Sequence, residues 1–184
     1  MNKQVNPNHG ITGAKVTPAD VKLFMDFIKG KRPKKGKIVK STRAVQNNSY
    51  RDADVYFIDF KHKKLYEVLK RIANTVNAHF NYNIDGIEKA QVIRYKAPSN
   101  GYDYHIDLGN DEEALKRKIS VSLILNEDYE GGELCFRSGV EEQCLKGTSG
   151  DVVAFSSFVP HKVNPVTKGQ RYVVIVWFTG SPFK

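Results

Sequence analysis

The chain has 184 residues, of which 40% are hydrophobic and 27% charged, and its formal net charge is +9 at pH 7. This length gives one domain with a sizeable core and excludes two well-formed domains, while the composition excludes disordered and fibrous proteins. The N-terminus has no apolar core of a signal peptide and no later stretch approaches a membrane span, so we expect a cytoplasmic protein with no membrane partner.

Two helices are predicted in the first half of the chain. Thr17, Pro18 and Asp20 supply an N-cap, a proline at the first helical position and an acid in the first turn, so a helix should run to about Lys29. A second helix is predicted over about 63–80, because apolar residues recur there at helical spacing. Between them we expect a short strand at about 55–58.

A strongly basic segment follows the first predicted helix. Its seven cations are Lys29, Lys31, Arg32, Lys34, Lys35, Lys37 and Lys40. Interrupting glycine and proline residues predict a mobile loop, which would attract an acidic protein or nucleic acid or simply aid solubility. Because the segment contains no aromatic residue that would stack on a base, the solvated loop is favoured.

From residue 89 onward the pattern changes to strands. They are expected at about 90–95, 104–108, 119–125, 133–136, 152–157 and 171–178. Many strands preceded by helices predict an α+β, mainly β protein, in which N-terminal helices buttress a double-sheet jelly roll. The charged segment 110–118 is expected to be an exposed loop that acts as a lid, and Gly131-Gly132 to form a tight turn.

Cys135 and Cys144 are the only cysteines, and they flank residues 137–141, which are expected to turn a hairpin. A disulfide between them is geometrically conceivable. Reduced thiols are nevertheless favoured, because disulfides are rare in cytosolic proteins.

The most informative feature is His105-Ile106-Asp107, followed by His161. Two imidazoles and one carboxylate are the ligand set with which non-haem Fe(II) enzymes hold a metal and leave positions open. In a strand, side chains two apart point to the same face, so His105 and Asp107 would converge. His161 follows a β-rich run and is expected where a strand gives way to a loop.

Arg171 begins a β-branched and aromatic run that is typical of a strand buried on both faces. A buried guanidinium needs a carboxylate partner, for which the distal carboxylate of 2-oxoglutarate and Asp151 are the two candidates. Period two places Arg171 and Trp177 on one face, where Trp177 either packs in the core or lines a substrate pocket. Tyr102 and Tyr104 should face away from His105 and pack, with Tyr102 kept as a further substrate-pocket candidate.

Several motifs in this order resemble the Fe(II)/2-oxoglutarate dioxygenases, specifically the prolyl 4-hydroxylase-like family. The similarity covers most of residues 88–180 and is carried by residues 94–95, 101–107, 125–134 and 161–171. The resemblance implies that His105, Asp107 and His161 are iron ligands, that Arg171 holds the distal carboxylate of 2-oxoglutarate, and that Tyr95 hydrogen-bonds the same molecule. Animal collagen-type relatives have a lysine in place of the arginine, which puts a collagen-like substrate in doubt.

The resemblance implies one dioxygenase domain over residues 1–184, with helical support at about 15–80 and the jelly-roll core at about 88–180. It implies Fe(II) as cofactor, 2-oxoglutarate and O₂ as co-substrates, ascorbate as reductant, and hydroxylation of a prolyl residue in a peptide or protein. Three alternatives remain open: the same chemistry on a free amino acid or small metabolite, the same chemistry on a nucleobase, and a non-catalytic metal-binding jelly roll. The oligomeric state is not readable from the sequence.

Overall fold

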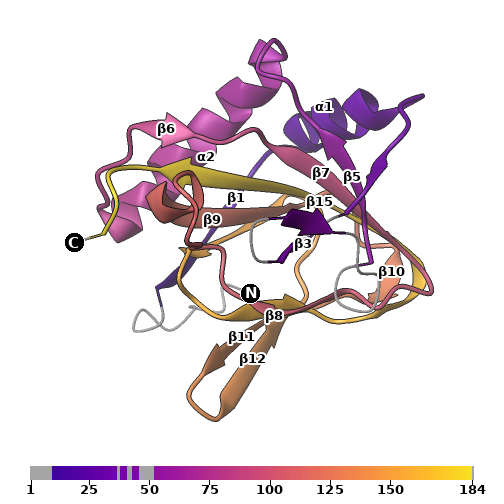
Figure 1. The fold of residues 1–184 in the computed structure, drawn as a ribbon. Helices are drawn as coiled ribbons and strands as arrows, with labels where there is room; N and C mark the ends of the chain where they lie inside the picture. Colours follow the sequence, from indigo (N-terminus) through magenta and orange to yellow (C-terminus); the bar gives the residue numbers. More distant parts are fainter. Residues whose placement is uncertain (1–9, 37, 41–42, 46–51, 184) are drawn as a thin grey trace.

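Two antiparallel β-sheets face each other in the computed structural model, and two helices cover the outer face of the larger sheet (Figure 1). The structure describes residues 10–36, 38–40, 43–45 and 52–183. The prediction of a mainly β, double-stranded β-helix core buttressed by N-terminal helices is confirmed.

Both predicted helices are present. Helix α1 (Pro18–Ile28) begins with a capping box between Thr17 and Asp20, and α2 spans Lys63–Phe80, as the spacing of its apolar residues predicts. No helix in the part of the chain that the structure describes is long and apolar enough to cross a membrane.

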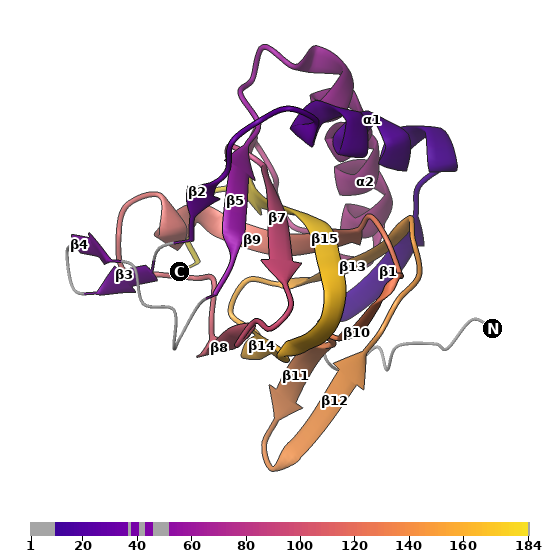
Figure 2. The ribbon, with the colours of Figure 1, turned by 90° about the vertical axis from the view of Figure 1, so that its right-hand side faces the viewer.

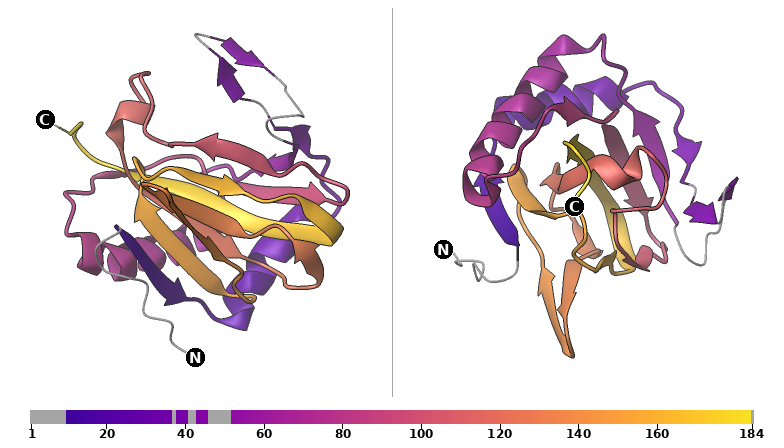
Figure 3. Two further views of the ribbon diagram at one scale, coloured as in Figure 1. Left: turned by 90° about the horizontal axis from the view of Figure 1, so that it is seen from below. Right: turned by 60° about the vertical axis from the view of Figure 1, so that its left-hand side comes forward.

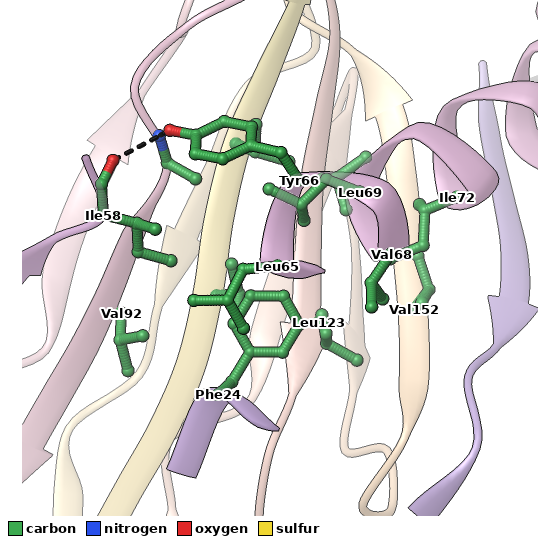
Figure 4. Packing of buried hydrophobic residues seen from close by; sticks show 14 of the residues in the cluster. Phe24, Ile58, Leu65, Tyr66, Val68, Leu69, Ile72, Val92, Leu123 and Val152 are labelled. Atoms are coloured by element: carbon green, nitrogen blue, oxygen red, sulfur yellow. Dashed lines mark hydrogen bonds between the residues drawn. The ribbon is translucent and has the colours of Figure 1, made fainter. Parts of the chain in front are cut away.

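The apolar face of α2 packs on the larger sheet and forms the main core. Figure 4 shows Leu65, Val68 and Leu69 of this helix close to Val92 and Leu123 of the sheet, all of them buried. The Tyr66 hydroxyl donates to the Ile58 carbonyl at 2.8 Å and accepts from the Ala90 amide at 3.0 Å, and these bonds also fix the helix against the strands (Figure 4).

The larger sheet has the strand order β1-β13-β9-β15-β7-β5-β2 (Figure 2). Strands β6 and β10 also pair with β15. Its strands are β1 (Ile11–Lys15), β2 (Lys34–Lys35), β5 (Asp54–Phe57), β6 (Gly86–Ile87), β7 (Gln91–Lys96), β9 (Arg117–Ile124), β10 (Tyr129–Gly131), β13 (Asp151–Ser156) and β15 (Val166–Thr179). Alternate residues of β15 face opposite sides: Val174 and Val176 pack toward the helices, whereas Val173 and Ile175 face the smaller sheet.

The smaller sheet has the order β12-β11-β14-β8, and the hairpin of β11 and β12 projects from the molecule (Figure 3). Its strands are β8 (Tyr102–His105), β11 (Leu134–Ser138), β12 (Glu141–Leu145) and β14 (His161–Val163). A separate pair is formed by β3 (Ile38–Lys40) and β4 (Arg43–Val45).

The basic segment is not simply a loop, because Lys34–Lys35 forms β2 and Ile38–Lys40 forms β3. Strand β2 pairs with β5 at the end of the larger sheet, and such an edge position tolerates charged side chains. Lys37, which belongs to the same segment, lies outside the described residues.

The prediction of reduced cysteines is wrong. Cys135 and Cys144 lie directly opposite each other in the hairpin and form a disulfide, with their Cα atoms 4.0 Å apart. The hairpin register brings the two sulfur atoms together, whereas the prediction relied on a cytoplasmic location, which itself stays a prediction.

Candidate metal centre and co-substrate pocket

Three side chains with metal-binding atoms converge beside the smaller sheet. His105 ends β8, His161 begins the adjacent β14, and the two residues are register partners. The Nε2 atoms of His105 and His161 each lie 3.6 Å from an oxygen of Asp107, and all three side chains are at most 13% exposed. One atom from each residue lies within 4.8 Å of the others, so a single metal ion fits among them.

The backbone that carries these side chains differs from the prediction in two respects. Strand β8 ends at His105, so Asp107 is not its partner on one strand face. Instead, the amides of Asp107 and Leu108 both donate to the Ser157 carbonyl, at 2.9 and 2.8 Å, and this attachment orients the turn that carries the carboxylate. His161 begins a strand, whereas the sequence predicts the end of one.

The protein backbone sets the tautomers of both imidazoles. Nδ1 of His105 lies 2.8 Å from the Asp103 carbonyl, and Nδ1 of His161 lies 3.0 Å from the Val159 carbonyl. Since a carbonyl only accepts hydrogen bonds, each Nδ1 is the donor, and in the neutral ring Nε2 keeps its lone pair. Both lone pairs are therefore available to a metal, and the backbone contacts fix the ring orientations.

Asp107 is held in the ionised form that a metal requires. Burial raises the pKa of its carboxyl, but His161 and His105, together with Trp177 and Ser120, outweigh burial and bring the pKa below its ordinary value. The three groups thus present two imidazole nitrogens and a carboxylate, which is a donor set suited to Fe(II).

A partly buried ion pair behind the metal centre is not predicted by the sequence. Arg117 pairs with Glu88 through two bonds of 2.6 and 2.8 Å, and its Nη1 donates to the Asp107 carbonyl at 3.0 Å. Its guanidinium also lies 3.9 Å from the centroid of the Trp177 ring. The pair therefore supports both the turn of Asp107 and the indole beside it, although Arg117 gives no sequence signal beyond its place in a charged segment.

Aromatic rings surround the two histidines. Tyr102 stacks on His105 with ring centroids 3.7 Å apart, so the expectation that it faces away from His105 is wrong. An irregularity in the pairing of β8 with β14 breaks the simple alternation. Tyr104 does point elsewhere, since its hydroxyl donates to Glu142 at 3.0 Å.

Arg171 is a buried cation, only 2% exposed, and its Nε and Nη1 atoms have no hydrogen-bond partner in the described part of the chain. Asp151, the alternative carboxylate partner, instead pairs with Lys15 at 3.0 Å. The guanidinium lies 5.5 Å from the ring centroid of Tyr95, its register partner on β7. Two buried guanidinium nitrogens without a hydrogen-bond acceptor among the described residues form a site for an anion.

Gly131 ends β10 and Gly132 begins the two-residue connection to β11, and both have positive φ; the tight turn itself stays a prediction. At Gly132 a Cβ atom would lie 2.8 Å from Cδ of Arg171, so only glycine leaves that side chain its full space. The predicted lid segment 110–118 contains a short 3₁₀ helix, Ala114–Lys116, and its last two residues belong to β9. Its closure over the site stays a prediction.

The comparisons with known proteins agree with this geometry. A family model described as the 2OG-Fe(II) oxygenase superfamily matches residues 90–179. A PKHD-type hydroxylase of Alteromonas mediterranea is 40% identical over 86 residues, which make up 43% of this chain and 38% of that protein. The chain thus spans about two fifths of the length of the curated relatives it matches.

Two solved structures share the fold at low sequence identity. A prolyl hydroxylase from Trichoplax adhaerens, in complex with a peptide fragment of the hypoxia inducible factor oxygen degradation domain, has a TM-score of 0.75 at 20% identity and covers 93% of this chain and 84% of its own. A Pseudomonas putida prolyl-4-hydroxylase has a TM-score of 0.71 at 19% identity and covers 93% of this chain and 92% of its own.

Proposed function

We propose that this chain is an Fe(II)- and 2-oxoglutarate-dependent dioxygenase that hydroxylates a prolyl residue in a peptide or protein. Its residues 90–179 match the model of the 2OG-Fe(II) oxygenase superfamily, and the chain resembles the prolyl 4-hydroxylase-like proteins. Residues 1–184 would form one catalytic domain, with helical support at about 15–80 and the jelly-roll core at about 88–180. Succinate and CO₂ are the products formed from 2-oxoglutarate.

His105, Asp107 and His161 would hold the iron. The bound iron supplies the activation of O₂ and the oxidative decarboxylation of 2-oxoglutarate. The protein contributes two oriented Nε2 lone pairs and an ionised carboxylate, and three ligands from the chain leave positions open for both co-substrates.

The observation that carries the proposal is the buried guanidinium of Arg171, whose Nε and Nη1 atoms have no hydrogen-bond partner among the described residues. Burying such a charge is costly unless a carboxylate or another anion pairs with it, and its planar N–H groups suit a carboxylate bidentately. The distal carboxylate of 2-oxoglutarate would be this partner, and the hydroxyl of Tyr95 would donate a hydrogen bond to the same molecule. Gly132 keeps the space around the guanidinium open.

Tyr102 and Trp177 would line the substrate pocket. Tyr102 stacks on the metal-binding ring of His105, and Trp177 lies beside Asp107 and under Arg117. Two aromatic surfaces next to the metal suit a compact apolar group such as a pyrrolidine ring. The peptide in the Trichoplax adhaerens complex supports a polypeptide substrate.

The test measures succinate formation from 2-oxoglutarate with Fe(II), air and ascorbate as reductant, with and without a proline-containing peptide that is then examined by mass spectrometry. The proposal predicts succinate that rises with the peptide and one added oxygen atom on proline, and His161→Ala should abolish both. Slow succinate release that ignores the peptide would move the substrate to a free amino acid, small metabolite or nucleobase. Metal binding without any succinate would indicate a non-catalytic metal-binding module.

A further inference from the structure

A basic groove lies at the edge of the larger sheet, away from the metal ligands. It has a volume of roughly 530 Å³ and is lined by Lys31, Arg32, Lys34, Val55, Tyr56, Phe57 and Lys89. The lining therefore contains four cations and no acid. We call this surface the basic groove.

Part of the basic groove lies on the face of the larger sheet that is turned toward the smaller sheet and its metal-binding histidines. Register partners point to the same side of a sheet, and Phe57 is paired with Gln91, which is paired with Ile175. Ile175 shares its face of β15 with Arg171 and Trp177. Phe57 thus lies two strands away from β15, or about 10 Å, on the face that carries the proposed co-substrate and substrate residues.

The edge strand extends this face outward with positive charge. Lys34 is paired with Val55, which shares its face with Phe57, and the ammonium of Lys34 lies 5.8 Å from the centroid of the Phe57 ring. Phe57 is 47% exposed. The surface leading out from the site therefore passes over an exposed aromatic ring and ends among lysines.

The cations of the basic groove are poorly neutralised. Lys89 lies 3.7 Å from Asp59, whereas Lys31, Arg32 and Lys34 have no carboxylate within ion-pair distance in the described part of the chain. Burial lowers the pKa of Lys31, and the positive charge of nearby Lys61 lowers it further. An incoming anion would relieve this repulsion.

We propose that the basic groove binds an acidic segment of the polypeptide substrate, on one side of the proline that reaches the metal. The inference rests on the proposed function and adds a requirement for the substrate sequence. An extended peptide advances about 3.3 Å per residue, so it needs about three residues to cover the roughly 10 Å between β15 and Phe57 alone. The acidic residues should therefore lie at least about three positions from the proline.

Nucleic acid fits the basic groove less well, because base stacking needs several open aromatic faces. Tyr56 is only 7% exposed, and one face of Phe27 is covered by the ammonium of Lys31 at 3.2 Å from its centroid. Phe57 alone remains as an exposed ring in the groove lining. A peptide needs only charge complementarity and one apolar contact there.

The test compares the binding of two labelled peptides to the full chain, loaded with Fe(II) and 2-oxoglutarate without O₂, by fluorescence anisotropy. One peptide has a proline with aspartates three to six residues away, and the other has asparagines at those positions. The first variant is Lys31→Ala/Arg32→Ala/Lys34→Ala. The control variant is Lys63→Ala/Lys64→Ala/Lys70→Ala, which removes the same charge from exposed positions of α2.

The groove variant should bind the acidic peptide roughly tenfold more weakly, since three exposed charge pairs each contribute a modest amount. Its affinity for the neutral peptide, its melting temperature and its peptide-independent succinate release should not change, and the control variant should behave like the original chain. Added salt should reduce the preference for the acidic peptide.

Equal affinity of the original chain for both peptides, or an equal loss in the control variant, would overturn the proposal. So would a single-stranded oligonucleotide that binds more tightly than the acidic peptide and loses affinity in the groove variant. If the acidic preference depends on the groove but neither peptide is hydroxylated when O₂ is then admitted, the basic groove stands and the proposed prolyl activity fails.

Discussion

Replacing Arg171 with methionine distinguishes a role in co-substrate binding from a structural role. The first role predicts weaker 2-oxoglutarate binding without loss of stability, and the second predicts loss of stability without a change in 2-oxoglutarate affinity. Methionine retains the length of an unbranched apolar chain and removes the charge. If the guanidinium lacks a partner until 2-oxoglutarate binds, its removal should not destabilise the free protein. Replacing a buried ion pair with apolar side chains of similar volume is often neutral or stabilises a protein by roughly 1–4 kcal/mol.

The same substitution should greatly weaken 2-oxoglutarate binding. Breaking a buried ion pair costs about 3–5 kcal/mol, which corresponds to a roughly 150- to 4,000-fold rise in the dissociation constant. Isothermal titration of 2-oxoglutarate into the Fe(II)-loaded protein without O₂ would measure this change, and urea denaturation of the free protein would measure stability. Iron binding should persist, because Arg171 is not one of the proposed ligands.

Arg94→Met is the matched control. Arg94 lies on the neighbouring strand and is paired with Asp54 through bonds of 3.1 and 2.6 Å, so its removal should destabilise the protein and leave 2-oxoglutarate affinity unchanged. If Arg171→Met behaves like this control, Arg171 has a structural role and the account of the co-substrate pocket is refuted.

Three further predictions concern the surroundings of the site and the stability of the fold. Glu88→Ala leaves the Arg117 guanidinium, 20% exposed, without its carboxylate, and should lower the free energy of unfolding in urea by about 2–3 kcal/mol; an unchanged value would show that the pair is unimportant. Burial raises the pKa of Asp54, but its two cationic neighbours outweigh burial and lower the pKa below 3.8. The ionised carboxylate therefore stabilises the fold above pH 3.8, and this stabilisation is lost as the solution becomes more acidic. In Asp54→Asn the melting temperature should consequently fall less steeply with decreasing pH than in the original chain. Opening the disulfide between Cys135 and Cys144, nine residues apart, should lower stability by about 2.5 kcal/mol, and a melting temperature indifferent to reductant would argue against the bond.

Local signals predicted the helices well. The N-cap, proline and acid at residues 17–20 identify the start of α1, and helical periodicity gives both ends of α2. Short strands such as β2 and β14 were missed, because two or three residues carry no periodicity and form only when a neighbouring strand supplies hydrogen bonds.

The identities of the candidate site residues followed from the order of motifs, but their geometry did not. Asp107 reaches the histidines through a turn attached to Ser157, and the pairing of Arg117 with Glu88 joins residues 29 positions apart. Such contacts depend on tertiary packing and leave no spacing pattern in the chain. That Nε and Nη1 of Arg171 lack a partner among the described residues is likewise apparent only from the folded structure.

The most direct test of the central claim is a turnover experiment in ¹⁸O₂ with Fe(II), 2-oxoglutarate and a proline-containing peptide. The account predicts one labelled oxygen atom in succinate for each labelled hydroxyl group on proline, with both lost in His161→Ala. Labelled succinate without a labelled peptide would keep the dioxygenase and reject the prolyl substrate. Absence of label from both products, with iron and 2-oxoglutarate bound, would contradict the account.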